Sequence, residues 1–351
     1  MFLPEAFHSE RDSILALLRF KRVSFKAQLL QNFVKERLTS QLGQASSTQE
    51  ETIMAACDMC DKLTWVSAMC DRFINCISGC SVAQFAKFQG ALYELDPVER
   101  ALNGWIEGLR KDDLKEKQCV SELQRYVFII IGLLDLTLTW RWRTMALMSH
   151  LGEIHLQSDL EGFASDVHMR VTLMQSYMEN SATALSHIRA IVQNKLPDTP
   201  EEDEEIASNF SKRSDAVISH SRSAKVVVSK ILRSLNDFQQ RSLSLTQDKL
   251  SQFEACEEAT KKLTDYAREV GEGVYALLYS DNTSSAPTWV DLQGTLFKTT
   301  EKVLRVVESD VFGALGKELR TLTNMLMELG STAADIDMTA ECGFFRPSCQ
   351  F

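Results

Sequence analysis

Cysteines are the residues of this chain whose spacing could most readily do chemistry. Cys57 and Cys60 form a C-x-x-C pair, which Cys70, Cys76 and Cys80 follow. Thiolates at such spacing can bind zinc or exchange disulfides. No second C-x-x-C completes a tetrahedral site, and the pair lies in a helical run without a preceding strand, so we expect buried cysteines that pack as small apolar side chains. The odd total of nine cysteines also favours a reducing compartment without disulfides.

Histidine and the common catalytic motifs give no stronger candidate. His150 and His155 flank Glu153, but their five-residue separation turns them to different faces of a helix, so we interpret them as surface or hydrogen-bonded histidines. The sequence lacks the glycine-rich phosphate and dinucleotide loops, the H-E-x-x-H zinc motif and the G-x-S-x-G nucleophile turn. We therefore expect no enzyme activity, no metal and no cofactor.

Composition points to an all-α chain. Only 15 Gly and 6 Pro occur in 351 residues, and long segments run without a helix breaker. The formal net charge of −10 opposes binding to nucleic acid. The first 43 residues carry seven Lys or Arg against four Asp or Glu, which could favour an acidic partner surface, although a solvated helix face is the simpler explanation.

Apolar residues at helical spacing predict a series of long helices that pack like coiled coils. The first should end near Gly43, and the second should start at Thr48 with a capping box and run to about Cys80. A shorter helix is expected over 82–92 and a long one over 158–194. The apolar stripe of the first helix is Leu30, Phe33, Val34, Leu38 and Leu42.

The clearest helix start lies within residues 92–116. Asp96 should act as the N-cap, Pro97 suits the first helical position, and Glu99 lies where a capping box needs an acid. Beyond it, one face is apolar and the other charged. The apolar face is Leu102, Trp105, Ile106 and Leu109, and the charged face is Glu107, Arg110, Lys111 and Asp112.

The chain should divide into two helical subdomains within an elongated bundle. An acidic, proline-containing segment predicts a linker over 196–206, between an N-terminal subdomain (1–195) and a C-terminal bundle (207–330). Residues 331–351 break the preceding patterns and are expected to form an irregular tail.

Two seams with alternating three- and four-residue steps mark the C-terminal bundle. They predict two antiparallel helices that pack together, with self-association through the seams as the alternative. The seams are Val217, Ser221, Ala224, Val228, Ile231, Leu235 and Phe238, followed by Phe253, Cys256, Thr260, Leu263, Ala267 and Val270. A single last helix is expected to start at Thr288 and to stop at Gly330.

The apolar run 126–140 has two further interpretations. It is shorter than the roughly 20 residues that cross a bilayer, and it contains Asp135, so a membrane span is disfavoured. Alternatively, Arg125-Tyr126-Val127 can be encoded with a GTATGT splice donor. Leaving out 126–143 removes 18 residues, keeps the reading frame and joins the flanks into one amphipathic helix, which suggests a retained intron.

The segment 92–116 resembles the helical domain between the two long coiled coils of the dynactin large subunit, of the Glued type. The shared pattern is L-Y, then E-R-x-L, then I-E-x-L-x-K-D-x-L-x-E. Residues 2–18 and 266–287 extend the resemblance in the same order, so that it spans roughly residues 1–329. The matching positions are Leu92, Tyr93, Glu99, Arg100, Leu102, Ile106, Glu107, Leu109, Lys111, Asp112, Leu114 and Glu116.

This resemblance implies a non-catalytic structural module of a dynactin large-subunit homologue, which supports dynein-dependent motor transport on microtubules in the cytoplasm. The implied partners are cytoplasmic dynein and dynactin subunits, including the actin-related filament. Direct microtubule binding is not implied, because the family's glycine-rich domain lies outside this segment. Candidate contact residues are Arg100, Glu107, Lys111 and Asp112, which could equally support the packing of their helix. The alternative is an unrelated helical scaffold or tether, including one anchored to a membrane through 126–140.

Overall fold

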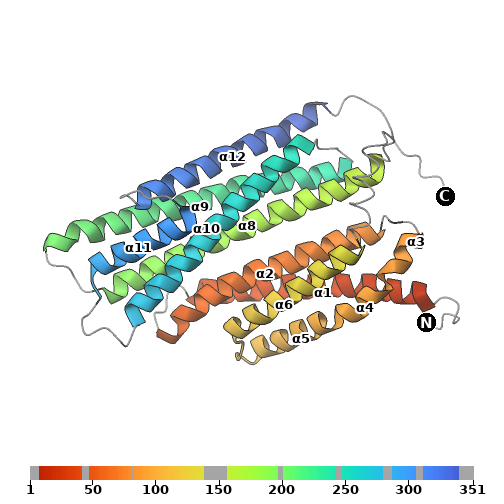
Figure 1. Ribbon diagram of the computed structural model, residues 1–351, viewed down its shortest axis with the longest axis horizontal. Coiled ribbons are helices and arrows are strands. Elements are labelled where there is room, and N and C mark those ends of the chain that lie inside the picture. Colours follow the sequence, from red (N-terminus) through yellow and green to blue (C-terminus); the bar gives the residue numbers. More distant parts are fainter. Residues whose placement is uncertain are drawn as a thin grey trace.

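The fold is all-α, as the sequence predicts. The computed structural model describes residues 8–41, 47–78, 80, 82–137, 156–196, 201–241, 247–279, 287–305 and 311–339. Within these ranges the chain forms helices joined by short turns, and it forms no strand. Figure 1 shows an elongated molecule in which the helices after residue 155 lie above those before residue 138.

The first half contains two long helices and a set of shorter ones packed against them. The long helices α1 and α2 pack on one another, α6 lies along α2, and η2, α4 and α5 cover α1. The bounds are α1 (His8–Gln41), α2 (Ser47–Ser78), α3 (Val82–Phe85), η2 (Ala86–Gly90), α4 (Ala91–Glu94), α5 (Asp96–Arg110) and α6 (Glu116–Thr137).

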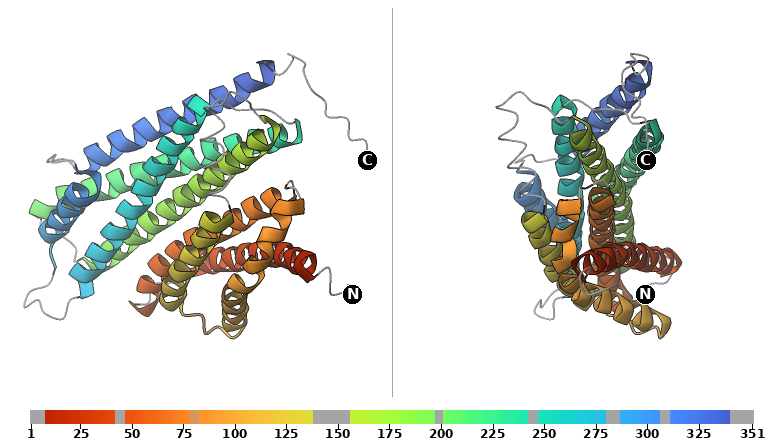
Figure 2. Two further views of the ribbon diagram at one scale, coloured as in Figure 1. Left: turned by 45° about the vertical axis from the view of Figure 1, so that its right-hand side comes forward. Right: turned by 90° about the vertical axis from the view of Figure 1, so that its right-hand side faces the viewer.

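The second half is a bundle of longer helices. The helix α8 packs against α9 and α10, α12 packs against α9, and α11 packs against α10 (Figures 1 and 2). The bounds are α8 (Leu156–Lys195), α9 (Glu201–Arg241), α10 (Gln247–Tyr279), α11 (Trp289–Leu304) and α12 (Val311–Thr339).

Two apolar cores lie on either side of α8. Met169 and Leu173 join the core formed by α1, α2 and the shorter helices. Val171, Met174 and Met178 join the core of the second half. Because α8 also packs directly against α2, this one helix contributes side chains to both cores.

The two predicted seams are buried, although the helices that carry them do not mainly pack on one another. Among the described side chains, every seam residue of α9 from Val217 to Leu235 and of α10 from Phe253 to Val270 is buried. The seam of α9 faces α8 and α12, whereas that of α10 faces α8 and α11. The seams are therefore used within a single chain. The side chain of Phe238 lies outside the described residues.

Several predicted helix ends differ from the structure. The expected last helix is two helices. Arg305, the C-cap of α11, adopts a left-handed conformation (φ 57°), which ends that helix. Gly330 does not end α12, which extends to Thr339 and so includes the first residues of the predicted tail. The acidic residues 201–205 form the first turns of α9. The division at 196–206 otherwise stays a prediction.

Other elements follow the sequence closely. Thr288 is the N-cap of α11: its side chain accepts from the backbone N–H of Asp291, whose carboxylate accepts in return from Thr288, a complete capping box. In α1, Leu30, Val34 and Leu38 are buried as predicted, but Phe33 is 45% exposed, because it lies to one side of the stripe.

The described part of the apolar run continues α6 up to Thr137. Ile130 and Leu133 are buried in the first core, and the ring of Tyr126 lies 6.0 Å from that of Trp105. Burial against other helices accounts for part of this apolar run, whereas Phe128 and Ile131 are 63% and 37% exposed. Among the helices described, none combines the length and the apolar character that crossing a membrane requires. Residues 138–143 lie outside the described residues.

Candidate interaction surface

Three of the four predicted contact residues form a line on the outer face of α5. Arg100, Glu107 and Lys111 follow one another at spacings of seven and four residues, which places them on one side of the helix. Their side chains are 78%, 52% and 68% exposed. Arg100 pairs with Asp96, and Glu107 lies 3.4 Å from Lys111. Such exposed pairs contribute little to stability, so these charges are able to exchange partners.

Asp112, the fourth predicted residue, has a structural role at the end of α5. It adopts a left-handed conformation (φ 55°). Its backbone N–H donates to the carbonyl of Leu109 at 3.2 Å, and that of Asp113 donates to Gly108 at 2.9 Å. This pair of bonds is a Schellman motif, and aspartate is among the non-glycine residues that tolerate its left-handed position. The carboxylate of Asp112 also lies 3.3 Å from Arg37 of α1.

The inner face of α5 is fixed by Glu99. Its carboxylate lies 2.9 Å from Arg19, 2.7 Å from Arg22 and 2.8 Å from Lys26, all on α1. The hydrogen bond from Arg22 and then that from Lys26 lower the pKa of Glu99 to about 2, against the opposing effect of burial. The predicted capping role of Glu99 is therefore wrong: it is buried and binds α1.

The predicted N-cap at Asp96 is also wrong. Leu95 occupies the cap position in a right-handed helical conformation, and no side chain caps the helix. Leu95 N–H donates to Ala91 and Glu99 N–H donates to Leu95, so α4 continues almost directly into α5. Because the preceding turn already supplies hydrogen-bond partners, Asp96 is left to pair with Arg19 at 3.1 Å and with Arg100.

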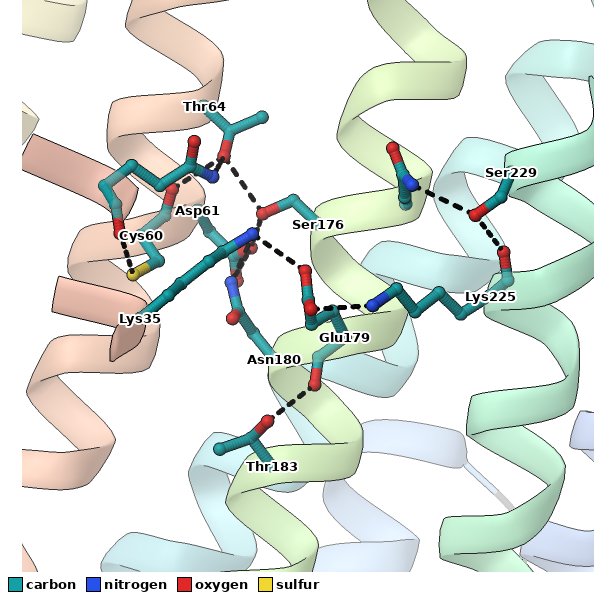
Figure 3. A network of polar contacts seen from close by, with 12 residues as sticks. Lys35, Cys60, Asp61, Thr64, Ser176, Glu179, Asn180, Thr183, Lys225 and Ser229 are labelled. Atoms are coloured by element: carbon teal, nitrogen blue, oxygen red, sulfur yellow. Dashed lines mark hydrogen bonds and ion pairs between the residues drawn. The ribbon is translucent and has the colours of Figure 1, made fainter. Parts of the chain in front are cut away.

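A second charged cluster joins the two halves of the molecule (Figure 3). Glu179 on α8 accepts hydrogen bonds from Lys35 on α1 at 2.7 Å and from Lys225 on α9 at 2.6 Å. Burial opposes ionisation, but these two hydrogen bonds keep the pKa of Glu179 below its ordinary value. The cluster fixes α8 between helices from both halves.

A buried carboxyl group lies beside this cluster, on the contact between α2 and α8 (Figure 3). Asp61 accepts from Ser176 at 2.7 Å and from Asn180 at 2.6 Å, and the hydroxyl of Thr64 lies 3.0 Å from that of Ser176. Asp61 is 6% exposed, and burial raises its pKa to about 7. Its second oxygen has no hydrogen-bond partner among the described residues.

Asp61 and Glu179 were not predicted from the sequence, although polar residues on apolar helix faces are a signal for the site around Asp61. Asp61 follows Cys60 in the middle of a buried helix face, and Ser176 and Asn180 stand four residues apart among the apolar positions of α8. Polar residues on an apolar face usually find one another. The sequence does not show which helices pack together, so the contact of Asp61 with Ser176 and Asn180 could not be predicted.

The C-x-x-C cysteines are buried as predicted. Cys57 and Cys60 lie in the first core together with Cys70. Burial raises the pKa of Cys60 to about 12 and that of Cys57 well above its ordinary value, so both are thiols rather than reactive thiolates. In the part of the chain that the structure describes, no group of His, Cys, Asp or Glu is arranged to hold a metal ion. His150 and His155 lie outside it.

The chain is an all-α bundle in which two cores share one long helix, and its described charges are either paired between helices or displayed on an outer face. The chain belongs to the dynactin family. The family model for dynactin, the dynein associated protein, matches residues 1–141 and 142–235. The match ends well before residue 329, where the predicted resemblance ended.

Two dynactin subunit 1 proteins are similar to part of this chain. The chain is 26% identical over 200 residues to that of Xenopus laevis and 25% identical over 202 residues to that of Gallus gallus. These stretches cover 54% and 55% of this chain but 15% of each relative. The chain therefore spans a small part of the length of the relatives that it matches.

The family match bears on the proposed intron. Its two parts meet at residues 141 and 142, within 126–143, and they include that segment instead of leaving it out. The retained intron itself stays a prediction about codons.

Proposed function

We propose that this chain is a non-catalytic structural module of a dynactin large-subunit homologue that supports dynein-dependent transport along microtubules. The membership of the dynactin family and the similarity to dynactin subunit 1 support it. The place of action would be the cytoplasm, at the microtubule cytoskeleton. The partners would be cytoplasmic dynein and other dynactin subunits, including the actin-related filament.

The observation that carries this proposal at the level of residues is the two-sided character of α5. Its inner face is fixed to α1 by Glu99, so the outer line of Arg100, Glu107 and Lys111 is held in a defined place. Charges that alternate in sign along a helix favour one register with a complementary helix and disfavour others. We propose that Arg100, Glu107 and Lys111 contact a partner protein. Asp112 lies next to them and ends the helix.

The test is a charge reversal on α5 with a matched control on α12. The first variant combines Arg100→Glu, Glu107→Lys and Lys111→Glu. The control combines Lys317→Glu, Glu318→Lys and Arg320→Glu, which alters the same charges on exposed residues of α12. Each full chain is tagged and recovered from cells, and the recovered dynactin and dynein subunits are quantified by mass spectrometry.

We expect the wild-type chain and the α12 control to recover these subunits, and the α5 variant to recover at least tenfold less. Equal recovery by all three would remove α5 as the contact while leaving the proposed function in place. A wild-type chain that recovers no dynactin or dynein subunit would overturn the proposed function itself.

A further inference from the structure

A shallow groove of about 470 Å³ runs between α8 and α9. Its α9 side presents Arg222, Lys225, Val226, Lys230 and Arg233, and Glu179 of α8 lies opposite. These α9 residues recur at three- and four-residue spacing, so they form one continuous face of the helix. The groove is on α9 and α8, apart from the α5 surface.

The groove is basic in a chain whose net charge is −10. Between Asp215 and Asp237, α9 contains four Lys or Arg and no acidic residue. The acid in the groove, Glu179, is already bound by Lys225 and by Lys35 from α1. Among the described side chains, no carboxylate pairs with Arg222, Lys230 or Arg233. The groove therefore holds uncompensated positive charge.

The fold uses Lys225 to bind Glu179, but among the described side chains it gives Lys230 and Arg233 no acidic partner. Like charges three or four residues apart on a helix are mildly destabilising, and Val226 lies 55% exposed in the middle of them. An apolar centre surrounded by cations is what a binding surface needs, because burial of the centre gives affinity and the charges set the partner and its orientation.

We infer that this groove binds an acidic helix of a partner protein. From Arg222 to Arg233 the face spans twelve residues, about 17 Å or three helical turns. A matching helix would carry Asp or Glu at three- and four-residue spacing over three turns, with a single apolar residue placed against Val226. The cations lie in a line along α9 instead of converging on one point, which fits a helix better than a single phosphate group. The chain's overall negative charge disfavours nucleic acid.

The first experiment measures binding of a designed probe by fluorescence anisotropy at about 150 mM salt. The probe is a fluorescein-labelled, alanine-based helical peptide of four turns with Glu along one face and Leu at its centre. A second peptide has the same composition but spreads Glu around the helix, and a third has Gln in place of Glu. A single-stranded oligonucleotide of equal charge is the fourth probe.

The variants are Lys230→Glu with Arg233→Glu in the groove and Lys317→Glu with Arg320→Glu on α12, which is an exposed pair of the same type and spacing. We expect the one-faced acidic peptide to bind wild type and the α12 control equally, and the groove variant at least tenfold more weakly. A peptide with Lys in place of Glu should instead prefer the groove variant. Val226→Asp should weaken binding of the acidic peptide without changing the circular dichroism spectrum.

The inference is overturned if the groove and α12 variants lose affinity alike, if the spread-Glu peptide binds as well as the one-faced peptide, or if the oligonucleotide alone binds. Absence of any binding by the acidic peptide at millimolar concentration also overturns it. Because the purified chain and a synthetic peptide suffice, none of these results depends on the proposed role in dynactin.

Discussion

The helices α1 and α9 are both rich in basic residues, but most of the described charges are paired within the fold in α1 and exposed to solvent in α9. In α1, Arg19, Arg22 and Lys26 surround one carboxylate, that of Glu99. In α9, Lys230 and Arg233 face solvent along a groove in which the acid among the described lining residues, Glu179, is already bound by Lys35 and Lys225. A basic stretch in a sequence can therefore be part of the interior or part of an interface, and the position of the nearest acid decides which.

The comparison also explains the basic N-terminal stretch. The sequence suggested an acidic partner or a solvated face for residues 1–43. The structure shows acidic partners within the chain itself: Glu99 for the middle of α1, Glu179 for Lys35, and Asp112 for Arg37. An exposed basic surface lies instead on α9, for which the sequence predicted only an apolar seam.

The largest expected effect concerns Asp61, an interior carboxyl group that, unlike Glu99, is not surrounded by cations. Its folded pKa of about 7 lies above the ordinary value of 3.8, so the folded state holds a proton that the unfolded state releases. The contribution of Asp61 to the free energy of unfolding is fully present below pH 4. It falls by roughly 4 kcal/mol as the pH rises through 7. Asp61→Asn should remove this loss. Urea unfolding of both proteins between pH 4 and pH 8 measures it, and parallel curves would contradict it.

The next largest effect tests the pairing of the α1 cations with Glu99. Glu99→Gln leaves three cations around a neutral amide and should lower the free energy of unfolding by about 3 kcal/mol at pH 7. Because the folded pKa of Glu99, about 2, lies below its ordinary value of 4.5, this stabilisation is present above pH 4.5 and is lost as the pH falls toward 2. Chemical unfolding at pH 7 and pH 3 measures it.

Arg100→Ala is the matched control for Glu99, since Arg100 is 78% exposed in an ion pair on the outer side of the same helix. It should change stability by less than about 0.5 kcal/mol. If Arg100→Ala and Glu99→Gln destabilise the protein equally, the contrast between an anchored inner face and a free outer face of α5 does not hold.

A smaller effect distinguishes the two roles of Asp112. Asp112→Val forces a β-branched residue into the left-handed position and should destabilise the chain by about 1–2 kcal/mol. Asp112→Gly should retain or slightly increase stability, because glycine adopts this conformation without strain. Thermal unfolding followed by circular dichroism compares them. If Gly destabilises the chain as much as Val, the pairing of Asp112 with Arg37 matters more than its backbone conformation.

The smallest effect completes the comparison. Replacing Lys230 and Arg233 by Ala should change stability by no more than about 0.5 kcal/mol in either direction, because neither charge has an acidic partner among the described side chains. Urea unfolding of the double variant beside wild type measures this. A loss of 2 kcal/mol would show that α9 uses its cations inside the fold, as α1 does.

The sequence predicts well what depends on one helix at a time. The seams of α9 and α10, the apolar face of α5 and the cap at Thr288 all follow from local spacing and local hydrogen bonds. Contacts between distant helices are not encoded in this way. Glu99 has the position of a capping-box acid, yet it binds Arg22, 77 residues earlier in the chain.

The candidate sites show the same limit. The exposed line on α5 could be predicted because one helix defines it, whereas the groove beside α9 needs α8 as its second wall. Arg305 also escaped prediction, since arginine carries no local preference for the left-handed conformation that separates α11 from α12.

The helix α8 also determines how the molecule carries load. It is 40 residues long, about 60 Å at the rise of an α-helix, and it supplies side chains to both cores. The two halves are therefore joined by the side chains that α8 packs into both cores, which is a contact along a rigid helix. We therefore expect the two halves to unfold together when the molecule is pulled.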